Sequence, residues 1–394
     1  MSRPIHILFA AHSGAQGGAE WCLDTTLRHL DRSRFQATVV FAWDGPMTES
    51  ARRLGCDVVV MRLAWWMYAE RNLWYWKNLT VGAAVRIPRL VHLIRDREID
   101  LVYTNTATIF ESALAARWAK VPHVWHVHEV LTDQHTRPRL VPIGTIKRRL
   151  AAWSDRVIFE SRSSQSVCRD VIPEGKSLFV HNSVRFDGGV CNADRGAVRE
   201  RLGLEPTKPV VAWVGRFSER KNPLLMIEAI ARGQLAGQAT FVFAGEGPLE
   251  SPVRQRIAER GLDGACRLIG FQHDVRPLLQ AADLLVLTSR EESFGLVLIE
   301  AGACGRPVVA TRTQGPTEIV VEGATGFLVD VDDVGGLADK VRLLMRDEPL
   351  RRRMGEAAAR RVEELFSPEK NTRKIEQVID EVIEDRKRKA MGRE

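Results

Sequence analysis

Short apolar runs alternate with longer amphipathic stretches along most of the chain. Six runs in the first half are hydrophobic almost without interruption. Strands of a parallel sheet are covered on both faces, so they lack the polar alternation of half-exposed strands. The pattern therefore predicts a parallel sheet with crossover helices. The predicted strands are Ile5–Ala11, Ala37–Ala42, Val58–Leu63, Leu101–Thr104, His123–Val127 and Val157–Glu160.

The same alternation begins again after a polar, glycine-containing connection at residues 182–208. We therefore expect two doubly wound α/β domains in tandem, residues 1–183 and 184–370. Ligands of such sheets bind outside the carboxyl ends of the strands, so two facing domains would share a central cleft. The second set of predicted strands is Val210–Val214, Thr240–Ala244, Arg267–Ile269, Leu284–Leu287, Pro307–Thr311 and Phe327–Val329.

Apolar side chains recur at helical spacing within residues 368–386. This predicted C-terminal helix, assigned to a separate segment at 371–394, needs an apolar surface to cover. Either domain can offer that surface, and packing back on the first domain is the expected arrangement. Basic residues crowd the end of the chain, and we expect disorder from Asp385 to Glu394.

The composition is that of an ordinary globular protein, with 45% hydrophobic and 27% charged residues among 394. The six cysteines are scattered and form no C-x-x-C pair, so we expect reduced thiols and no disulfide framework or structural zinc. The run Ile5–Ala11 is too short for a secretory signal, and no apolar run reaches the roughly 18 residues of a membrane span. These features predict a cytoplasmic protein.

The excess positive charge lies in the first half of the chain. Residues 1–181 hold 24 lysines and arginines against 17 aspartates and glutamates, a net charge of +7, whereas residues 182–394 hold 33 of each. Such asymmetry indicates an anionic partner for the first half: a membrane surface, a phosphorylated acceptor or nucleic acid. A dispersed, solvated basic surface is the alternative.

Two cations follow the predicted strand Val210–Val214. Arg216 and Lys221 lie in the loop after it, and Asn222 with Pro223 has the pattern of an N-cap and a first helical residue. A planar guanidinium and a compact ammonium at the carboxyl end of a strand suit a diphosphate. A solvated basic loop is the alternative interpretation.

Two carboxylates follow the predicted strand Leu284–Leu287. Glu292 and Glu300 are eight positions apart. A helix that starts near Phe294 and Gly295 would present its free N–H groups to an anion. Glu300 would then lie inside an apolar helix, where a carboxylate is unfavourable unless it accepts hydrogen bonds, for example from ribose hydroxyls.

Two further segments follow predicted strands of the second half. Gly245, Glu246 and Gly247 allow close backbone approach, or they form a plain turn. Glu318, shortly after Gly315, opens a predicted helix and is favourable in its first turn even without a ligand.

In this order, the segments resemble the nucleotide-sugar-binding domain of GT-B glycosyltransferases, specifically the retaining enzymes of family 4 (glycosyl transferases group 1). Each segment is a weak signal alone, but the ordered set is specific and covers much of the second half. The matching segments are Gly215-Arg216 with Lys221, Gly245-Glu246-Gly247, Glu292-x7-Glu300 with Phe294-Gly295-Leu296, Gly305-x-Pro307-Val308-Val309, and Gly315 with Glu318.

The resemblance implies two tandem Rossmann-like domains facing a central cleft, the GT-B fold. It implies that Arg216 and Lys221 neutralise the donor diphosphate, that Glu300 bonds the ribose, and that Glu292 lies near the reacting sugar. The amino end of a helix at Phe294, Gly295 and Leu296 would also contact the diphosphate.

The first domain matches less closely. Gly17 and Gly18 lie between a predicted strand and helix, where family members have a glycine pair close to the donor phosphate and the acceptor. His128 follows the strand His123–Val127 at the position where the family has a histidine facing the donor sugar. His126 lies two positions earlier on the same strand face and is the alternative.

The implied function is a retaining transfer of a sugar from a nucleotide diphosphate sugar to a sugar or lipid-linked acceptor, in bacterial surface polysaccharide or glycolipid assembly. Preorganised positive charge would stabilise the leaving diphosphate. Because the protein cations Arg216 and Lys221 would neutralise the diphosphate, we expect no metal and no cofactor. The residues do not identify the donor base, its sugar or the acceptor.

Other functional classes remain open at this point. A metal-dependent hydrolase would use His126, His128 and His135, but it lacks a nearby Asp-His completion. A catalytically inactive nucleotide-sugar-binding or scaffold protein would keep the same motifs. A GT-B phosphorylase is a further enzymatic alternative.

The stretch 61–77 holds four of the ten tryptophans and two of the three tyrosines. Such residues favour the boundary between water and lipid, and basic neighbours favour anionic headgroups. We expect peripheral attachment to the inner face of a membrane through Trp65, Trp66, Trp74 and Trp76, with no nucleic-acid partner. Packing within the first domain, or lining an acceptor pocket, is the alternative.

Overall fold

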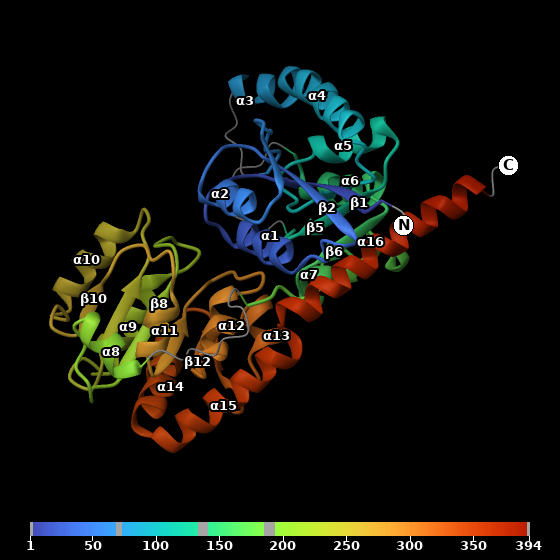
Figure 1. Cartoon of the computed structure of the whole chain (residues 1–394). Coiled ribbons are helices and arrows are strands. Elements are labelled where there is room, and N and C mark those ends of the chain that lie inside the picture. Colours follow the sequence, from blue (N-terminus) through green and yellow to red (C-terminus); the bar gives the residue numbers. More distant parts are fainter. Residues whose placement is uncertain (1–2, 68–72, 133–140, 185–193, 392–394) are drawn as a thin grey trace. The chain divides into compact units, whose positions relative to one another are not determined.

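The computed structural model describes residues 3–67, 73–132, 141–184 and 194–391. The chain forms two compact units, Met1–Ser183 with Pro368–Glu394 and Val184–Ser367. Each unit holds one parallel β-sheet between layers of helices (Figure 1). The two-sheet α/β architecture predicted from the apolar runs is therefore confirmed. The middle of the expected connection, residues 188–192, lies outside the described residues.

The sheet of the first unit contains seven parallel strands within the described ranges. Its strands are β1 Ile5–Ala11, β2 Phe35–Phe41, β3 Asp57–Val60, β4 Leu101–Thr104, β5 His123–Val127, β6 Arg156–Phe159 and β7 Ser177–Phe179. Across the sheet their order is β3-β2-β1-β4-β5-β6-β7. The strand numbers descend as far as β1 and ascend from β4, so the order of connection reverses between these two parallel neighbours. Strand β7 escaped prediction because its three residues are only half-buried and form no continuous apolar run.

Helices cover both faces of this sheet. One face packs against α1, α2 and α16, and the other against α4, α5 and α6. The helices of the first unit are α1 Gly18–His29, α2 Pro46–Arg53, α3 Leu73–Lys77, η1 Asn78–Gly82 (a π-helix), α4 Ala83–Asp96, α5 Glu111–Ala119, α6 Ile143–Trp153, α7 Arg162–Ser166, η2 Glu174–Lys176 (a 3₁₀ helix) and α16 Pro368–Met391.

The sheet of the second unit contains six parallel strands among the residues described. They are β8 Val210–Val214, β9 Thr240–Ala244, β10 Cys266–Leu268, β11 Leu284–Leu287, β12 Val308–Thr311 and β13 Gly326–Val329, in the order β10-β9-β8-β11-β12-β13. The helices are α8 Arg195–Arg201, α9 Pro223–Arg232, α10 Glu250–Glu259, α11 Arg276–Ala281, α12 Leu296–Ala303, α13 Gln314–Ile319, α14 Val334–Arg346 and α15 Glu348–Leu365. The strand order reverses between β8 and β11.

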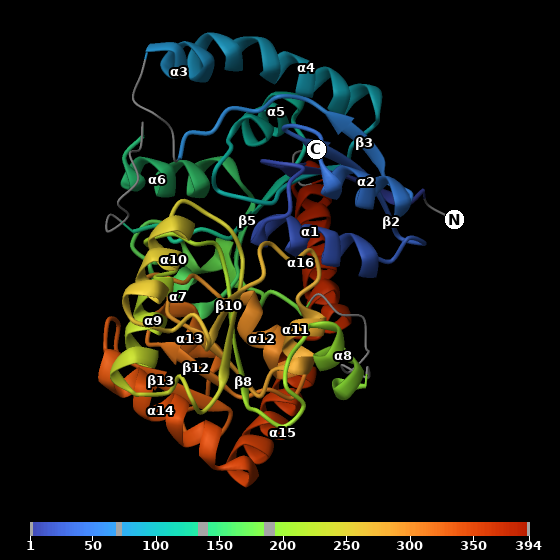
Figure 2. The same cartoon turned by 90° about the vertical axis from the view of Figure 1, so that its left-hand side faces the viewer.

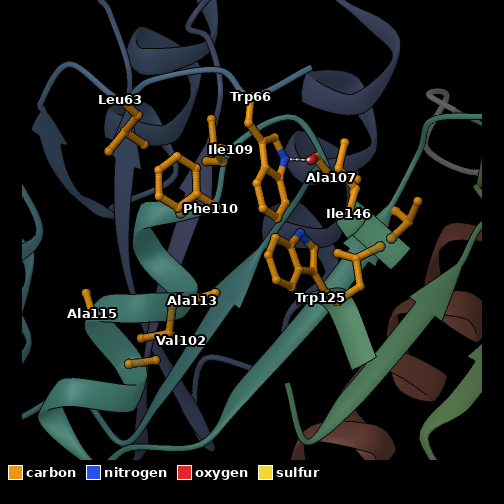
Figure 3. Packing of buried hydrophobic residues seen from close by; sticks show 14 of the residues in the cluster. Leu63, Trp66, Val102, Ala107, Ile109, Phe110, Ala113, Ala115, Trp125 and Ile146 are labelled. Atoms are coloured by element: carbon orange, nitrogen blue, oxygen red, sulfur yellow. Dashed lines mark hydrogen bonds between the residues drawn. The ribbon is translucent and has the colours of Figure 1, made fainter. Parts of the chain in front are cut away.

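Trp66 belongs to the core of the first unit. Its side chain is 4% exposed, its indole N–H donates to the carbonyl of Ala107 at 2.6 Å, and its ring stacks on Trp125 with centroids 6.2 Å apart (Figure 3). A buried indole with a satisfied N–H is a structural element of a core. The expectation that Trp66 contacts a membrane is therefore wrong.

Helix α16 packs on the first unit. It lies beside α1 (Figure 2). Its buried face includes Ile375, Val378 and Ile379, which belong to the apolar cluster on the α1 side of the sheet. The helix continues to Met391, so the disorder expected from Asp385 is wrong for residues 385–391. Residues 392–394 lie outside the described residues. Asp385 pairs with Arg156 at 3.0 Å, and this contact holds the last turns against the sheet.

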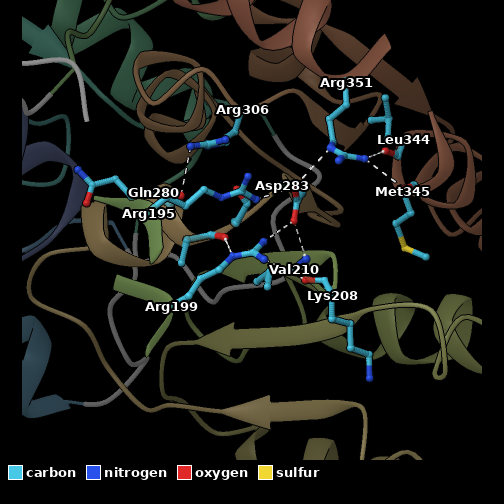
Figure 4. Close-up of polar contacts among 12 residues, drawn as sticks. Arg195, Arg199, Lys208, Val210, Gln280, Asp283, Arg306, Leu344, Met345 and Arg351 are labelled. Carbon is cyan, nitrogen blue, oxygen red and sulfur yellow. Dashed lines mark hydrogen bonds and ion pairs between the residues drawn. The ribbon is translucent and has the colours of Figure 1, made fainter. Parts of the chain in front are cut away.

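A buried charge cluster, here called the arginine hub, lies at the amino ends of the strands of the second unit. Asp283 precedes β11 and accepts the N–H of Val210 at 2.8 Å, Arg195 at 2.6 Å and Arg199 at 2.7 Å, with Arg351 at 3.4 Å (Figure 4). Burial raises the pKa of the Asp283 carboxyl, but the Val210 N–H and the guanidinium groups outweigh it and lower that pKa.

The cysteines depart from the expectation of six reduced thiols. Cys304 is disulfide-bonded. Four others, Cys22, Cys56, Cys168 and Cys266, are free and buried. Spacing along a sequence detects only local pairs, whereas a disulfide requires proximity in space. Among the described residues, every helix is too short or too polar to cross a membrane.

Candidate active site

The second sheet brings two loops together where its strand order reverses. The loop after β8 and the loop after β11 leave neighbouring strands at their carboxyl ends, the usual ligand position in such sheets. The hydroxyl of Thr288 donates toward the carbonyls of Lys221 at 2.9 Å and Asn222 at 2.8 Å. The backbone N–H of Arg290 donates to the carbonyl oxygen of Arg220 at 2.8 Å. These bonds fix the two loops side by side.

Lys221 and Glu292, predicted for separate tasks, form an ion pair across these loops. The ammonium donates to Oε2 of Glu292, which also accepts the hydroxyl of Ser289 at 3.1 Å. Burial raises the pKa of the Glu292 carboxyl, but the charges of Lys221 and Arg220 and these hydrogen bonds lower it overall. Burial lowers the pKa of Lys221, and the carboxylate opposes that effect. An arriving anion would therefore compete with Glu292 for the ammonium.

Asn222 and Arg216 lie in the same loop, but the side chain of Asn222 is hydrogen-bonded within the protein and that of Arg216 is exposed. Asn222 stands at the N-cap position of α9 with φ +47°, but its amide donates to Asp332 at 2.8 Å and does not cap the helix. The predicted capping role is therefore wrong, because a more distant acceptor is in reach. Arg216 is exposed, so an anion from solvent can reach its guanidinium.

The glycines after β9 are required by packing. Gly245 and Gly247 have φ values of +147° and +154°, and a Cβ on Gly245 would lie 1.9 Å from the carbonyl oxygen of Gly215. The glycine turn thus packs directly against the backbone of the loop that carries Arg216, and close packing explains the glycines without a ligand. Glu246 between them is exposed and accepts the N–H of Phe271 at 3.3 Å.

The amino end of α12 lies where the sequence predicts it. Gly295 is the N-cap with φ +100°, and Leu296 is the first helical residue. Phe294 is fully buried, and its ring meets Phe366 edge-on at 5.8 Å, which anchors this end in the core. Glu300 lies one turn further along and is 1% exposed. The first N–H groups of a helix have no intrahelical partner, so this end can receive an anion.

Glu318 does not lie in the first turn of its helix. It is the fifth of six residues of α13, and its carbonyl oxygen accepts Arg361 at 2.9 Å. Stabilisation by the helix dipole, the alternative to ligand binding, therefore does not apply. Its neighbour Gly315 is required by close packing, because a Cβ there would lie 2.1 Å from the carbonyl oxygen of Phe294.

In the first unit, the predicted glycine pair lies at the start of α1. Gly17 is the N-cap in extended conformation, and Gly18 begins the helix. A Cβ on Gly17 would lie 2.4 Å from a carboxylate oxygen of Glu20. Glu20 is buried and its Oε1 lies 3.1 Å from Nε2 of His12. The glycine therefore makes room for a buried carboxylate beside the loop.

His128 lies among polar side chains at the carboxyl ends of the strands. The group of His126, His128, Asn105, Glu160 and Asn182 is called the edge cluster below. Nε2 of His128 lies 3.2 Å from Oδ1 of Asn105, whose amide N–H donates to the carbonyl of Ala19 at 2.8 Å. Its Nδ1 lies 3.6 Å from Oε2 of Glu160, which also accepts the amide of Asn182 at 2.7 Å. Because both ring nitrogens face oxygen atoms, the cluster orients the imidazole from two sides.

His126, the alternative to His128, faces inward. It is 3% exposed, and its Nδ1 lies 2.7 Å from the hydroxyl of Tyr103. Burial, and then the neighbouring His128, lower the pKa of His126 well below its usual range. His135 lies outside the described residues, and those that are described form no group of three ligands able to hold a metal.

Sequence reasoning missed several members of the edge cluster. Asn105 and Glu160 directly follow the apolar strands β4 and β6, Asn182 lies three residues after β7, and all three are buried. For Asn105 and Glu160, a polar residue immediately after a continuously apolar strand was the available signal. It was overlooked because none of these residues belongs to a recognised motif.

Comparison with known proteins identifies relatives of both halves. Residues 194–361 match the family model "Glycosyl transferases group 1", and residues 16–187 match "Glycosyltransferase Family 4". N-acetyl-alpha-D-glucosaminyl L-malate synthase of Bacillus anthracis is 33% identical over 59% of this chain and 61% of its own length. The lipopolysaccharide core biosynthesis glycosyltransferase LpsE of Rhizobium meliloti is 37% identical over 40% of this chain and 46% of its own. The matches thus span about half to three fifths of these relatives.

Solved structures match over nearly the whole chain. HepE of Anabaena, in complex with UDP and glucose, is 25% identical with a TM-score of 0.77, covering 95% of this chain and 99% of its own. A glycosyltransferase of Rickettsia africae shares the fold at 18% identity, with a TM-score of 0.78 and coverage of 97% and 99%.

Proposed function

Because this chain belongs to the group 1, family 4 glycosyltransferases and has their GT-B fold, we propose that it transfers a sugar from a nucleotide diphosphate sugar to an acceptor hydroxyl, with retention. The observation that carries the proposal is the partly buried Lys221–Glu292 pair where the strand order reverses between β8 and β11, beside the amino end of α12. A pair of this kind gives a site for an anion next to a carboxylate that can face a sugar. HepE, solved with UDP-glucose, supports this donor class.

The charged candidates, the amino end of α12 and His128 each have a task in this proposal. Charge that builds on the leaving diphosphate is stabilised by Lys221, Arg216 and the N–H groups that follow Gly295. Glu292, released from Lys221 by the diphosphate, is free to contact the donor sugar. Glu300 accepts the ribose hydroxyls. His128 orients the donor sugar, and the orientation of its imidazole comes from the edge cluster.

A donor screen tests the proposal. UDP-, GDP- and ADP-sugars are added in a thermal-shift assay, where a ligand at about 100 times its Kd stabilises the folded protein by roughly 2.7 kcal/mol. Turnover of the stabilising donor is then measured with Lys221→Ala, which should lose roughly 10- to 150-fold in kcat/KM. Lys340→Ala is the matched control. It removes a lysine of α14 whose ammonium lies over the ring of Phe327, 4.4 Å from the ring centroid. Donor binding without turnover by the wild-type protein would overturn the proposal.

The transfer is proposed to need no metal, because protein cations supply the charge that the diphosphate requires. Activity should persist in EDTA at the level of the untreated protein. Loss on chelation that Mg²⁺ or Mn²⁺ restores would contradict this part of the mechanism.

We also propose that the first unit meets an anionic membrane, which agrees with a role in surface polysaccharide or glycolipid assembly. Helices α3, η1 and α4 follow one another without interruption, and Trp76, Val81 and Val85 are 44%, 58% and 50% exposed along them. Lys77 and Arg89 are exposed on the same helices and suit anionic headgroups. The side chain of Trp74 lies outside the described residues.

Co-sedimentation with phosphatidylglycerol-containing vesicles tests this surface. Binding should fall with added salt and should drop in the variant Trp76→Ser with Val81→Ser and Val85→Ser. Trp118→Ser, which removes a 53% exposed tryptophan from α5, should bind like wild type. Equal binding to neutral vesicles would contradict an electrostatic contribution.

A further inference from the structure

Three aromatic rings meet at the carboxyl edge of the first sheet. His12 follows β1, Trp43 follows β2 and Trp65 follows β3. The ring centroids of Trp43 and Trp65 lie 5.3 Å apart, and those of Trp65 and His12 also lie 5.3 Å apart. Trp43 is 42% exposed, whereas the core tryptophans of this unit are covered. These three rings are called the aromatic platform below.

The aromatic platform is held in place by its loops. The indole N–H of Trp65 donates to the carbonyl of His12 at 3.3 Å, and the hydroxyl of Tyr75 donates to the carbonyl of Trp65 at 2.8 Å. A Cβ on Gly14 would lie 2.5 Å from the carbonyl oxygen of Trp43, so the loops after β1 and β2 touch directly. A ligand that binds here finds rings already fixed, which lowers the entropic cost of binding.

A polar group stands at one side of the platform. Nε2 of His12 lies 3.1 Å from Oε1 of Glu20, whose side chain is 3% exposed while that of His12 is 19% exposed. The buried carboxylate therefore lies within ion-pair distance of the imidazole, and the side chain of His12 remains partly exposed. Apolar ring faces beside one polar edge match a pyranose, which has C–H groups on its faces and hydroxyls on its rim. The negative face of an indole attracts such C–H groups.

We propose that the aromatic platform binds the pyranose ring of an uncharged sugar acceptor. Trp43 and Trp65 stack on the ring, His12 bonds one of its hydroxyls, and Glu20 acts as a positioning residue for His12. A lipid chain would leave the His12–Glu20 pair without a partner, whereas the hydroxyl groups of an uncharged sugar can hydrogen-bond to it. This assignment rests on the proposed function, since the donor motifs of the second unit leave the acceptor to be bound elsewhere.

Saturation-transfer NMR with methyl α-D-glucopyranoside tests the platform without any need for turnover. The C–H protons of the pyranoside should receive saturation from the wild-type protein and from Trp118→Ala, the matched control on α5. Trp43→Ala should lose the effect, and Trp43→Phe should retain much of it. With a working donor, Trp43→Ala should lose about tenfold in kcat/KM for the acceptor, or about 1.4 kcal/mol, while UDP binding measured in the same samples stays unchanged.

Each outcome decides one of the two proposals. Equal pyranoside saturation in wild type and Trp43→Ala would overturn the platform, as would its absence from the wild-type protein. Binding of uridine that depends on Trp43 would overturn the acceptor assignment in favour of a nucleobase. If pyranoside binding depends on Trp43 but no donor is turned over, the platform stands and the transferase proposal fails.

Discussion

The arginine hub and the edge cluster are two buried polar groups with opposite placement. The hub surrounds Asp283 at the amino ends of the second sheet, and the edge cluster surrounds His128 at the carboxyl ends of the first. In the hub, Arg199 is 4% exposed and donates to the carbonyls of Ala281 at 3.0 Å and Pro206 at 2.6 Å as well as to Asp283. Its charge is therefore balanced and its hydrogen-bonding capacity is used.

The edge cluster is less complete. Within the part of the chain that the structure describes, Nε2 of His126 and Oδ1 of Asn182 are buried without a hydrogen-bond partner. Among the described atoms of the hub, only Nε of Arg195 is buried without a hydrogen-bond partner. The side chain of Arg195 as a whole is 40% exposed. Buried polar groups are normally satisfied, because an unsatisfied one costs stability. We infer from this difference that the hub stabilises the fold, while the edge cluster retains hydrogen-bonding capacity that a ligand or water can use.

The largest expected effect is on the hub. Asp283→Ala leaves several guanidinium groups without their carboxylate, and removing one partner of a buried charge group lowers the free energy of unfolding by about 3–5 kcal/mol. Urea denaturation measures this loss, and nucleotide binding by the remaining folded protein should be unchanged. Asp330→Ala is the control, since its carboxylate is 82% exposed and pairs with Arg312 only at 3.4 Å. Wild-type stability of Asp283→Ala would contradict a structural hub.

Acid should destabilise the first unit through His123. Burial lowers its pKa to about 4. Below pH 6.5 the unfolded chain binds a proton that the folded unit does not, so stability falls as pH drops from about 6.5 to 4, by up to about 1.4 kcal/mol per pH unit. Above pH 6.5 this group contributes no dependence.

Hydrogen exchange resolved by peptide measures this slope in each unit separately. His123→Gln should reduce the slope in the first unit, whereas the control His92→Gln, at an exposed position on α4, should leave it unchanged. An identical slope in wild type and His123→Gln would show that burial of this imidazole is not the cause.

A smaller and different effect is expected at the edge cluster. Glu160→Gln keeps the size of the side chain and an oxygen for Asn182, but it removes the charge that faces Nδ1 of His128. We expect a loss of about tenfold in kcat/KM, or about 1.4 kcal/mol, with little change in the free energy of unfolding. A shifted pH profile of kcat/KM distinguishes positioning of the imidazole from a packing defect. Loss of stability with unchanged kcat/KM would place Glu160 with the hub residues instead.

The smallest effect concerns a buried carboxylate in the same unit as the hub. Glu300→Gln weakens one ribose hydrogen bond, which is worth about 0.5–1.5 kcal/mol, so the nucleotide Kd should rise roughly 2- to 12-fold. Calorimetric titration with UDP, GDP and ADP measures the change, and urea denaturation checks that the fold is retained. An unchanged Kd would mean that Glu300, like Asp283, serves the fold.

The strands and the second-unit motifs could be predicted from the sequence. Runs such as Val210–Val214 and Leu284–Leu287 match β8 and β11 residue for residue, because a strand covered on both faces is apolar at every position. The helix start at Gly295 was also predictable, since a glycine after a strand and before an apolar helix is a local signal. These features depend on neighbours within a few positions of each other.

Residue patterns along the chain were therefore sufficient to predict the periodic elements of this protein and the order of its motifs. They were not sufficient to predict that Lys221 meets Glu292, that Trp66 is buried while Trp43 is exposed, or that Glu160 faces His128, because these contacts form only in the folded chain. Lys221 and Glu292 are 71 positions apart and meet only because β8 and β11 are neighbours in the sheet. The physical reason is that local periodicity is encoded in adjacent residues, whereas charge pairing and burial depend on distances that exist only after the strands have assembled.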